Sequence, residues 1–175
     1  MNEIIFENKF RRDKTTFKEI FFSYFFCSPI VIVYSIISAL YTVSFILAII
    51  SGPQAVKDSI LVMLFILFGY AILFIKYLQS VKIASERDNE VSGAEGIDCL
   101  VTVTNDEIIS NIKENNVALS FDKLEKAYQT KNYIVVETKA KLSYILKKDS
   151  FTVGDADSFI VFLREKGIKI KGKKN

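Results

Sequence analysis

Two long runs of apolar residues dominate the first half of the chain. Residues 30–50 (IVIVYSIISALYTVSFILAII) and 59–75 (SILVMLFILFGYAILFI) contain no formally charged side chain. As a helix the first run reaches about 31 Å, close to the hydrocarbon thickness of a bilayer. Gly52 and Pro53 interrupt the pattern, so we expect two transmembrane helices joined by a short external loop at 51–58. The alternative is a pair of buried core helices, but a chain of this length has little protein to cover helices that are apolar on every face.

The N-terminal segment, residues 1–29, contains a shorter helical pattern at 15–28 (TTFKEIFFSYFFCS). Thr15 or Thr16 can cap its start, and Pro29 interrupts it before the first apolar run. We expect an amphipathic aromatic helix in the headgroup zone of the membrane. The alternative is that it forms the cytoplasmic end of one long tilted helix. The aromatic residues expected at the membrane surface are Phe17, Phe21, Tyr24 and Phe25.

Small hydroxyl residues share one face of the first apolar run. Small side chains allow close helix approach, and hydroxyl groups offer weak hydrogen bonds between helices in a membrane. A transport path is disfavoured, because neither run contains the ionisable residues that mark ion or proton routes. The residues predicted to pack between helices are Ser28, Ser35, Ser38, Thr42 and Gly69.

Residues 76–96 are polar and predict a linker, and residues 97–168 predict a soluble domain. Short runs rich in β-branched and aromatic residues, separated by turn residues, indicate a small antiparallel sheet or barrel. An amphipathic helix begins near Asp155 and ends at Gly167, with acidic residues first and basic residues last. The fold class is therefore a membrane α-helical hairpin plus an α+β domain that the C-terminal helix closes. The strands are expected at 97–104, 107–112, 117–121, 132–138 and 141–148.

One stretch, LSFDKLEKAYQTKNYIVVE at 119–137, supports two interpretations. Phe121, Leu124 and Tyr128 follow helical spacing, but a helix of two turns between strands would be marginal. We favour a turn at 121–123 that leads into a strand bulged near Glu125.

The strand region also resembles a known family. Thr104, Glu107 and Ile108, then Phe121 with Leu124, Tyr133–Val136, and Lys148 with Phe151 are similar to the motifs of the YcxB-like family of bacterial membrane proteins. The resemblance implies two transmembrane helices followed by a pleckstrin-homology-like (PH-like) domain, an open barrel plugged by the C-terminal helix. It implies no catalytic role.

The distribution of positive residues predicts the orientation. Lys and Arg are frequent before the first apolar run, and Lys76 and Lys82 follow the second, whereas the loop between them has only Lys57. By the positive-inside rule both termini face the cytoplasm, and the expected location is the plasma membrane. Residues 169–175 form a basic tail, which either rests on anionic lipid at about 1 kcal/mol per lysine or is a frayed, solubilising end. Its lysines are Lys169, Lys171, Lys173 and Lys174.

Catalytic chemistry is not indicated. The chain has no histidine and none of the common nucleotide, zinc or hydrolase motifs, so we expect no enzyme activity, cofactor, metal or small-molecule substrate. Asp149, Asp155 and Asp157 are better explained by a turn and a helix cap than by a catalytic cluster. Cys27 and Cys99 are expected to be small buried hydrophobes rather than a redox pair. A net charge of +3 without a basic motif argues against nucleic acid.

Two functional hypotheses remain. The first is a membrane-tethered binding module that presents its cytoplasmic domain to a protein, a peptide or a lipid. The second is a structural membrane scaffold or an immunity-type self-protection protein, acting through a homo-oligomer or a protein partner. Both have the lipid bilayer as a partner.

Overall fold

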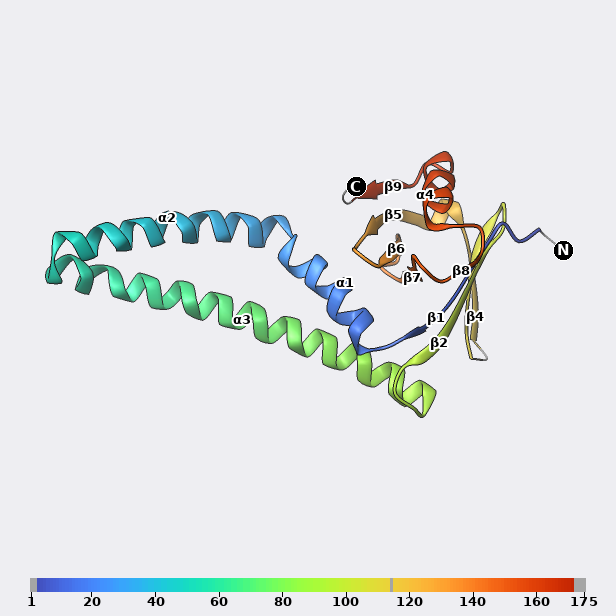
Figure 1. The fold of residues 1–175 in the computed structure, drawn as a ribbon, viewed down its shortest axis with the longest axis horizontal. Coiled ribbons are helices and arrows are strands. Elements are labelled where there is room, and N and C mark those ends of the chain that lie inside the picture. The colour runs from blue at the N-terminus through green and yellow to red at the C-terminus, as the bar shows by residue number, and fades with distance from the viewer. Residues whose placement is uncertain (1–2, 114, 172–175) are drawn as a thin grey trace. The chain divides into compact units, whose positions relative to one another are not determined.

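The structure is a computed structural model, and it describes residues 3–113 and 115–171 (Figure 1). The chain divides into two units. We call residues 21–83 the hairpin unit, and residues 1–20 together with 84–175 the sheet unit. The helices are α1 (Lys14–Phe26), α2 (Pro29–Ser51), α3 (Pro53–Ser92) and α4 (Ala156–Glu165), with a 3-10 turn, η1, at Phe121–Lys123. The strands are β1 (Phe6–Arg12), β2 (Ile97–Val103), β3 (Glu107–Ile112), β4 (Asn115–Ser120), β5 (Leu124–Gln129), β6 (Tyr133–Thr138), β7 (Ser143–Lys147), β8 (Phe151–Val153) and β9 (Lys169–Lys171).

The sheet unit contains two sheets. One has the strand order β4-β3-β2-β1-β8 and the other has the order β7-β6-β5-β9. All pairings are antiparallel except that of β5 with β9, which is parallel. The predicted α+β class with mainly antiparallel sheets is confirmed. The described strands do not close into a barrel, because β4 and β8 end one sheet while β7 and β9 end the other.

The main core of the sheet unit lies under α4. Phe159 and Leu163 of this helix are fully buried in a cluster with apolar residues of both sheets. Asp155 caps the helix, since its carboxylate accepts hydrogen bonds at 2.9 Å from the N–H groups of Asp157 and Ser158. The predicted closing helix is confirmed.

The ambiguous stretch folds as a turn and a strand. Phe121–Lys123 form η1, and β5 follows with a register shift between Leu124 and Lys126. Phe121 and Leu124 are buried in the core, and the shift leaves Glu125 at the surface. The turn and the bulge near Glu125 are therefore confirmed.

Strand β1 was not predicted. Residues 1–29 were expected to lie outside the domain, but Phe6–Arg12 pairs with β2 over its whole length and with β8 on its other side. Phe6, Asn8 and Phe10 are buried on one face. Asn8 occupies an inward position because its side chain donates to the Lys147 carbonyl at 2.7 Å and accepts from the Lys147 N–H at 3.0 Å, which links β1 to β7.

The predicted linker at 76–96 is mostly helical, since α3 continues to Ser92. The sequence there contains good helix formers, and Ser85 and Asp88 lie buried on one face. Gly93 follows with φ of +68°, the left-handed conformation that commonly ends a helix.

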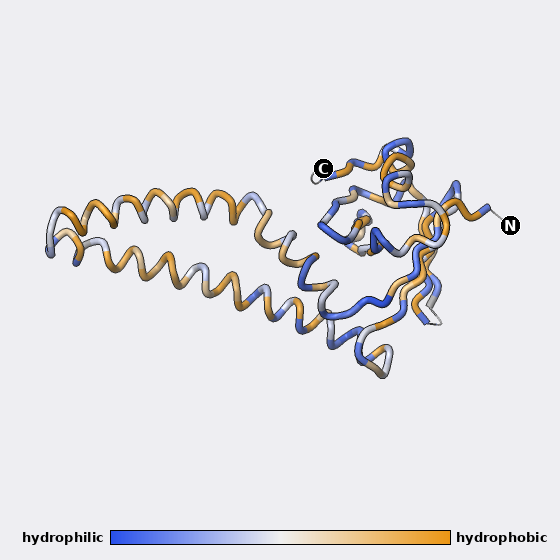
Figure 2. The backbone as a smooth tube through the Cα atoms, viewed as in Figure 1, coloured by the Kyte–Doolittle hydropathy of each residue, from blue (hydrophilic) through white to orange (hydrophobic). Residues whose placement is uncertain are grey.

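In the hairpin unit, α2 and the first part of α3 are hydrophobic along their length (Figure 2). Both helices are long and apolar enough to cross a membrane, with mean hydropathy of 2.3 and 2.4 in their most apolar windows. α1 and α2 are separate helices, so residues 15–28 are not the end of one long helix that continues into the first apolar run. The break occurs where the Ser28 hydroxyl accepts from the Val31 N–H and Pro29 begins α2.

Candidate functional site

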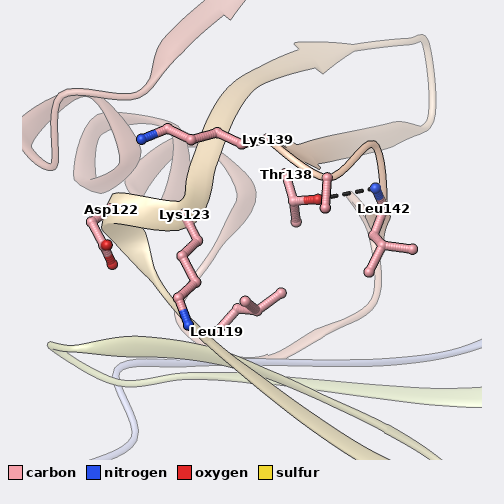
Figure 3. Close-up of a pocket in the computed structure, with 7 residues that line it drawn as sticks. Leu119, Asp122, Lys123, Thr138, Lys139 and Leu142 are labelled. Atoms are coloured by element: carbon pink, nitrogen blue, oxygen red, sulfur yellow. Dashed lines mark hydrogen bonds between the residues drawn. The ribbon is translucent and has the colours of Figure 1, made fainter.

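A groove lies between the two sheets of the sheet unit, and we call it the β4 groove. Its volume is about 330 Å³, and Figure 3 shows the residues that line it. The end of β4, the η1 turn and the hairpin between β6 and β7 form its walls. Its lining residues are Leu119, Asp122, Lys123, Thr138, Lys139, Ala140 and Leu142.

Backbone hydrogen bonds hold these walls in place. The Lys139 N–H donates to the Lys123 carbonyl at 2.9 Å, which joins the hairpin to η1. The Leu142 N–H donates to the Thr138 hydroxyl at 3.0 Å, and Figure 3 draws this hydrogen bond as a dashed line. Leu142 is 58% exposed, although it is apolar, because it projects at the mouth of the groove.

The charge of the β4 groove is slightly positive. The Ser120 hydroxyl donates to the Asp122 carboxylate, and this bond, with the nearby charges of Lys123 and Lys139, lowers the pKa of Asp122 below its ordinary value. Neither lysine forms an ion pair with any residue that the structure describes. The groove therefore offers an apolar floor with two cations and one carboxylate beside it.

Metal binding and carboxylate catalysis receive no support from the arrangement of side chains. Within residues 3–113 and 115–171, no group of three His, Cys, Asp or Glu residues could hold a metal ion. Asp155 caps α4, while Asp149 lies 3.4 Å from the ammonium group of Lys147. A hydrogen bond from Ser158 lowers the pKa of Asp155, so this carboxylate acts as a helix cap.

The residues expected at the membrane surface lie in different environments. Phe17 is buried in the sheet unit, where the Arg12 guanidinium carbon lies 5.5 Å from its ring centroid. Tyr24 is exposed, as are Lys76 and Lys82, whereas Phe21 and Phe25 are half-buried. Lys169 and Lys171 belong to β9 rather than to a tail, and Lys173 and Lys174 lie outside the described residues.

Two tyrosines that the sequence analysis did not single out join the helices of the hairpin unit. The Tyr70 hydroxyl donates to the Ser35 hydroxyl at 3.1 Å, and the Tyr34 hydroxyl donates to the Ile66 carbonyl at 2.9 Å. A Cβ added at Gly69 would overlap the Tyr34 hydroxyl, so this glycine permits the close approach.

The other predicted packing residues bond within their own helix or cap it. Ser38 donates to the Tyr34 carbonyl and Thr42 donates to the Ser38 carbonyl, each at 2.8 Å. Ser28 caps α2. Of the predicted set, Ser35 and Gly69 take part in contacts between the helices, and Ser38 is buried.

Two further polar contacts were not predicted from the sequence. Both lie inside the sheet unit, where one holds the end of α3 and the other holds α1. Arg12 forms a two-pronged ion pair with Asp88 at 2.6 and 2.8 Å. The net pKa of Arg12 is raised above its ordinary value. Burial of the guanidinium acts to lower this pKa, but the hydrogen bond and the negative charge of Asp88 outweigh burial. The Glu19 carboxylate accepts from the Asn132 N–H and amide at 2.7 Å each and from the Thr130 hydroxyl at 2.5 Å.

These features define a class: a two-sheet domain, with a groove between its sheets, in a chain that also carries two helices of membrane-spanning length. Residues 103–163 match the model of one family, described as YcxB-like protein. The resemblance inferred from the sequence is thereby confirmed over this part of the chain, which runs from the end of β2 to α4. No match was found among the curated proteins.

Proposed function

We propose that this chain is a two-pass membrane protein whose sheet unit is a PH-like binding module for a protein or peptide at the cytoplasmic side of the plasma membrane. The observation that carries the proposal is the β4 groove, an apolar depression of about 330 Å³ with cations beside it. Concave, mostly apolar sites with a few placed polar groups are the usual form of binding sites.

The membrane assignment rests on the surface of the hairpin unit. In the most apolar windows of α2 and α3 only 11% and 6% of the residues are buried, so nearly all of the hydrophobic surface faces outward. Two such helices in water would expose far more apolar area than a monomeric soluble protein does. A bilayer removes this cost, and the positive residues before α2 and after the apolar part of α3 favour cytoplasmic termini.

The PH-like assignment rests on the order of elements and on the family match. A succession of antiparallel strands folded into two sheets, followed by a C-terminal helix whose buried face covers the core, is consistent with such a domain. A fold of this kind does not specify a ligand, so the groove carries the argument about function.

A protein or peptide suits the β4 groove better than a lipid headgroup does. Recognition of a phosphorylated headgroup requires converging cations, and here the Asp122 carboxylate lies near both Lys123 and Lys139. Leu119, Ala140 and Leu142 instead offer apolar contact area. Basic residues beside an apolar floor fit an acidic segment of protein.

Site-specific photo-crosslinking in membranes tests the proposal. A photoreactive p-benzoylphenylalanine replaces Leu142 at the mouth of the groove, and a matched control replaces Val161, which is 51% exposed on α4. We expect a discrete protein adduct from position 142 and none from position 161. Adducts with lipid only, or equal adducts from both positions, would contradict a protein-binding groove.

A further inference from the structure

The four sheet edges of the sheet unit differ in how they are protected. Exposed strand edges offer unpaired N–H and C=O groups, and proteins shield them by short length, lysines, bulges or covering groups. β8 and β9 have three residues each, and β9 carries two lysines. The edge of β7 is covered at Lys147, whose N–H and C=O both bond to the Asn8 side chain.

Within the part of the chain that the structure describes, the β4 edge shows none of these protections. Its six residues, NNVALS, contain no charge and no proline, and its pairing with β3 runs without a register shift from Glu107↔Ser120 to Ile112↔Asn115. β4 is therefore a regular, uncharged strand of ordinary length at the end of a five-stranded sheet.

The ladder shows which groups of β4 point outward. The Glu107 carbonyl accepts from the Thr104 N–H at 3.0 Å, so the polar groups of Glu107 face β2. The pair Glu107↔Ser120 is then a non-hydrogen-bonded pair, and such pairs alternate along an antiparallel ladder. The N–H and C=O groups of Asn116, Ala118 and Ser120 consequently point away from β3. Among the described residues, no hydrogen bond from elsewhere reaches the backbone of Asn116 or Ala118.

The side chains of β4 lead into the β4 groove. Val117 and Leu119 share one face of the strand, and Leu119 packs against the core while lining the groove. Val117 on the same face is 47% exposed. A further strand paired with β4 would cover Val117 and place its own inward side chains between Leu119 and Leu142.

The charges at the groove indicate the chemistry of that strand. Lys123 and Lys139 lack an ion-pair partner in the described chain, whereas the nearby Lys141 is paired with Glu125 at 2.6 Å. Asp122 offsets one of the two free charges, which leaves the rim one positive charge in excess. A carboxylate on the incoming strand would therefore find an unpaired ammonium group.

We infer that the β4 edge binds an extended peptide segment by strand addition, and that the side chains of this segment that face the groove are apolar and include a carboxylate. The main-chain hydrogen bonds to Ala118 and its neighbours supply affinity, and the groove with its lysines supplies selectivity. This inference rests on the proposed function and specifies its partner and its binding mode.

A peptide-display selection tests the inference with the full chain embedded in nanodiscs. The probe is a random library of peptides of about ten residues, long enough to pair with the whole strand. Peptides enriched over empty nanodiscs are then measured against three variants. Ala118→Pro removes an outward N–H without touching the β3 ladder, Ala118→Ser keeps that N–H as the matched control, and Leu142→Glu places a negative charge at the groove.

We expect enriched peptides in which every second residue, on the side facing the groove, is apolar or acidic. Their affinity should fall about tenfold or more with Ala118→Pro, the effect of losing one or two main-chain hydrogen bonds, and stay within about twofold with Ala118→Ser. N-methylation of the peptide backbone should weaken binding as much. Thermal unfolding of each variant shows that the sheet unit remains folded.

Other outcomes separate the inference from the proposed function. Enriched peptides that bind Ala118→Pro as they bind the parent chain but fail to bind Leu142→Glu would overturn strand addition and leave the groove as a binding site. No enrichment over empty nanodiscs would overturn both. Enrichment of basic rather than acidic peptides would overturn the inferred charge of the segment.

Discussion

The hairpin unit and the sheet unit solve the burial of apolar side chains in opposite ways. Most large apolar residues of α2 and of the first part of α3 are exposed, and within α2 only Val31, Ser38 and Ala48 are buried. In the sheet unit Phe159, Ile134 and Leu146 are fully buried between sheets and helix. The difference teaches that the apolar side chains of the hairpin unit are left largely without protein cover, while the sheet unit makes its own apolar interior.

The polar contacts differ in the same way. The helices of the hairpin unit are joined by Tyr34 and Tyr70, each through one hydroxyl. In the sheet unit, Asn8, Arg12 and Glu19 each make two or more side-chain hydrogen bonds to distant parts of the chain. The polar groups of the sheet unit therefore help to specify its arrangement.

The largest effect is expected from the core of the sheet unit. Phe159→Ala should lower its free energy of unfolding by about 4 kcal/mol, because the ring is fully buried against Phe6 and Phe151 and its loss leaves a cavity. Denaturant unfolding of the full chain in nanodiscs measures the change. Val161→Ala, on the exposed side of the same helix, should change stability by less than about 0.5 kcal/mol. Equal losses for the two variants would contradict the assignment of the core.

The ion pair of Arg12 and Asp88 should have the next largest effect. Arg12→Ala leaves Asp88 buried without its partner, and we expect a loss of about 2 kcal/mol in the sheet unit. Replacing both residues, Arg12→Leu with Asp88→Leu, should recover part of the loss because no charge is then left unpaired. Denaturant unfolding of both variants at neutral pH checks this expectation. A double variant less stable than Arg12→Ala would contradict it.

In the hairpin unit, Gly69→Ala should destabilise the packing of α2 on α3 by about 1 kcal/mol, because the new methyl group overlaps the Tyr34 hydroxyl. Sodium dodecyl sulfate titration in mixed micelles, followed by far-UV circular dichroism, measures the loss. Tyr34→Phe removes the hydroxyl, so Gly69→Ala should cost less in that background. An undiminished cost there would show that the two groups do not meet.

The smallest effect concerns Glu19 and pH. Burial raises its pKa, but hydrogen bonds from Thr130 and Asn132 outweigh burial and lower it below the ordinary value of 4.5. Because the folded-state pKa is the lower one, the stabilisation is fully present above pH 4.5 and is lost as pH falls through the folded-state pKa. Glu19→Gln should cost roughly 1 kcal/mol at pH 7 and less as the solution becomes more acidic.

Unfolding curves of the parent chain and of Glu19→Gln across this pH range test the linkage. Asp98→Asn provides a control, because that carboxylate is exposed on β2 and forms no hydrogen bond or ion pair with any residue that the structure describes. A difference between Glu19→Gln and the parent chain that does not shrink toward low pH would contradict the role given to the Glu19 carboxylate.

Several elements were predictable because the residues that form them are close in sequence. The β6–β7 hairpin, α4 with its Asp155 cap, and the bulge near Glu125 follow from local patterns of apolar, turn and capping residues. The YcxB-like resemblance, carried by the same region, is confirmed over residues 103–163.

The candidate site was less accessible to sequence reasoning. The β4 groove depends on η1 meeting the hairpin between β6 and β7, through the bond from the Lys139 N–H to the Lys123 carbonyl. Its lysines resemble any other surface lysine in the sequence. The open edge of β4 is visible only once the strand order of both sheets is known.

By itself the sequence determined that two segments of this chain are apolar enough to cross a membrane and that the rest contains strands and one amphipathic helix, because hydrophobic periodicity and turn chemistry are local properties. Tertiary structure alone placed β1 inside a sheet. Asn8 and Asp88 are polar residues that become stable in the interior only when Lys147 and Arg12, far away in the sequence, satisfy their hydrogen bonds. That compensation is a property of the assembled fold, and no local pattern contains it.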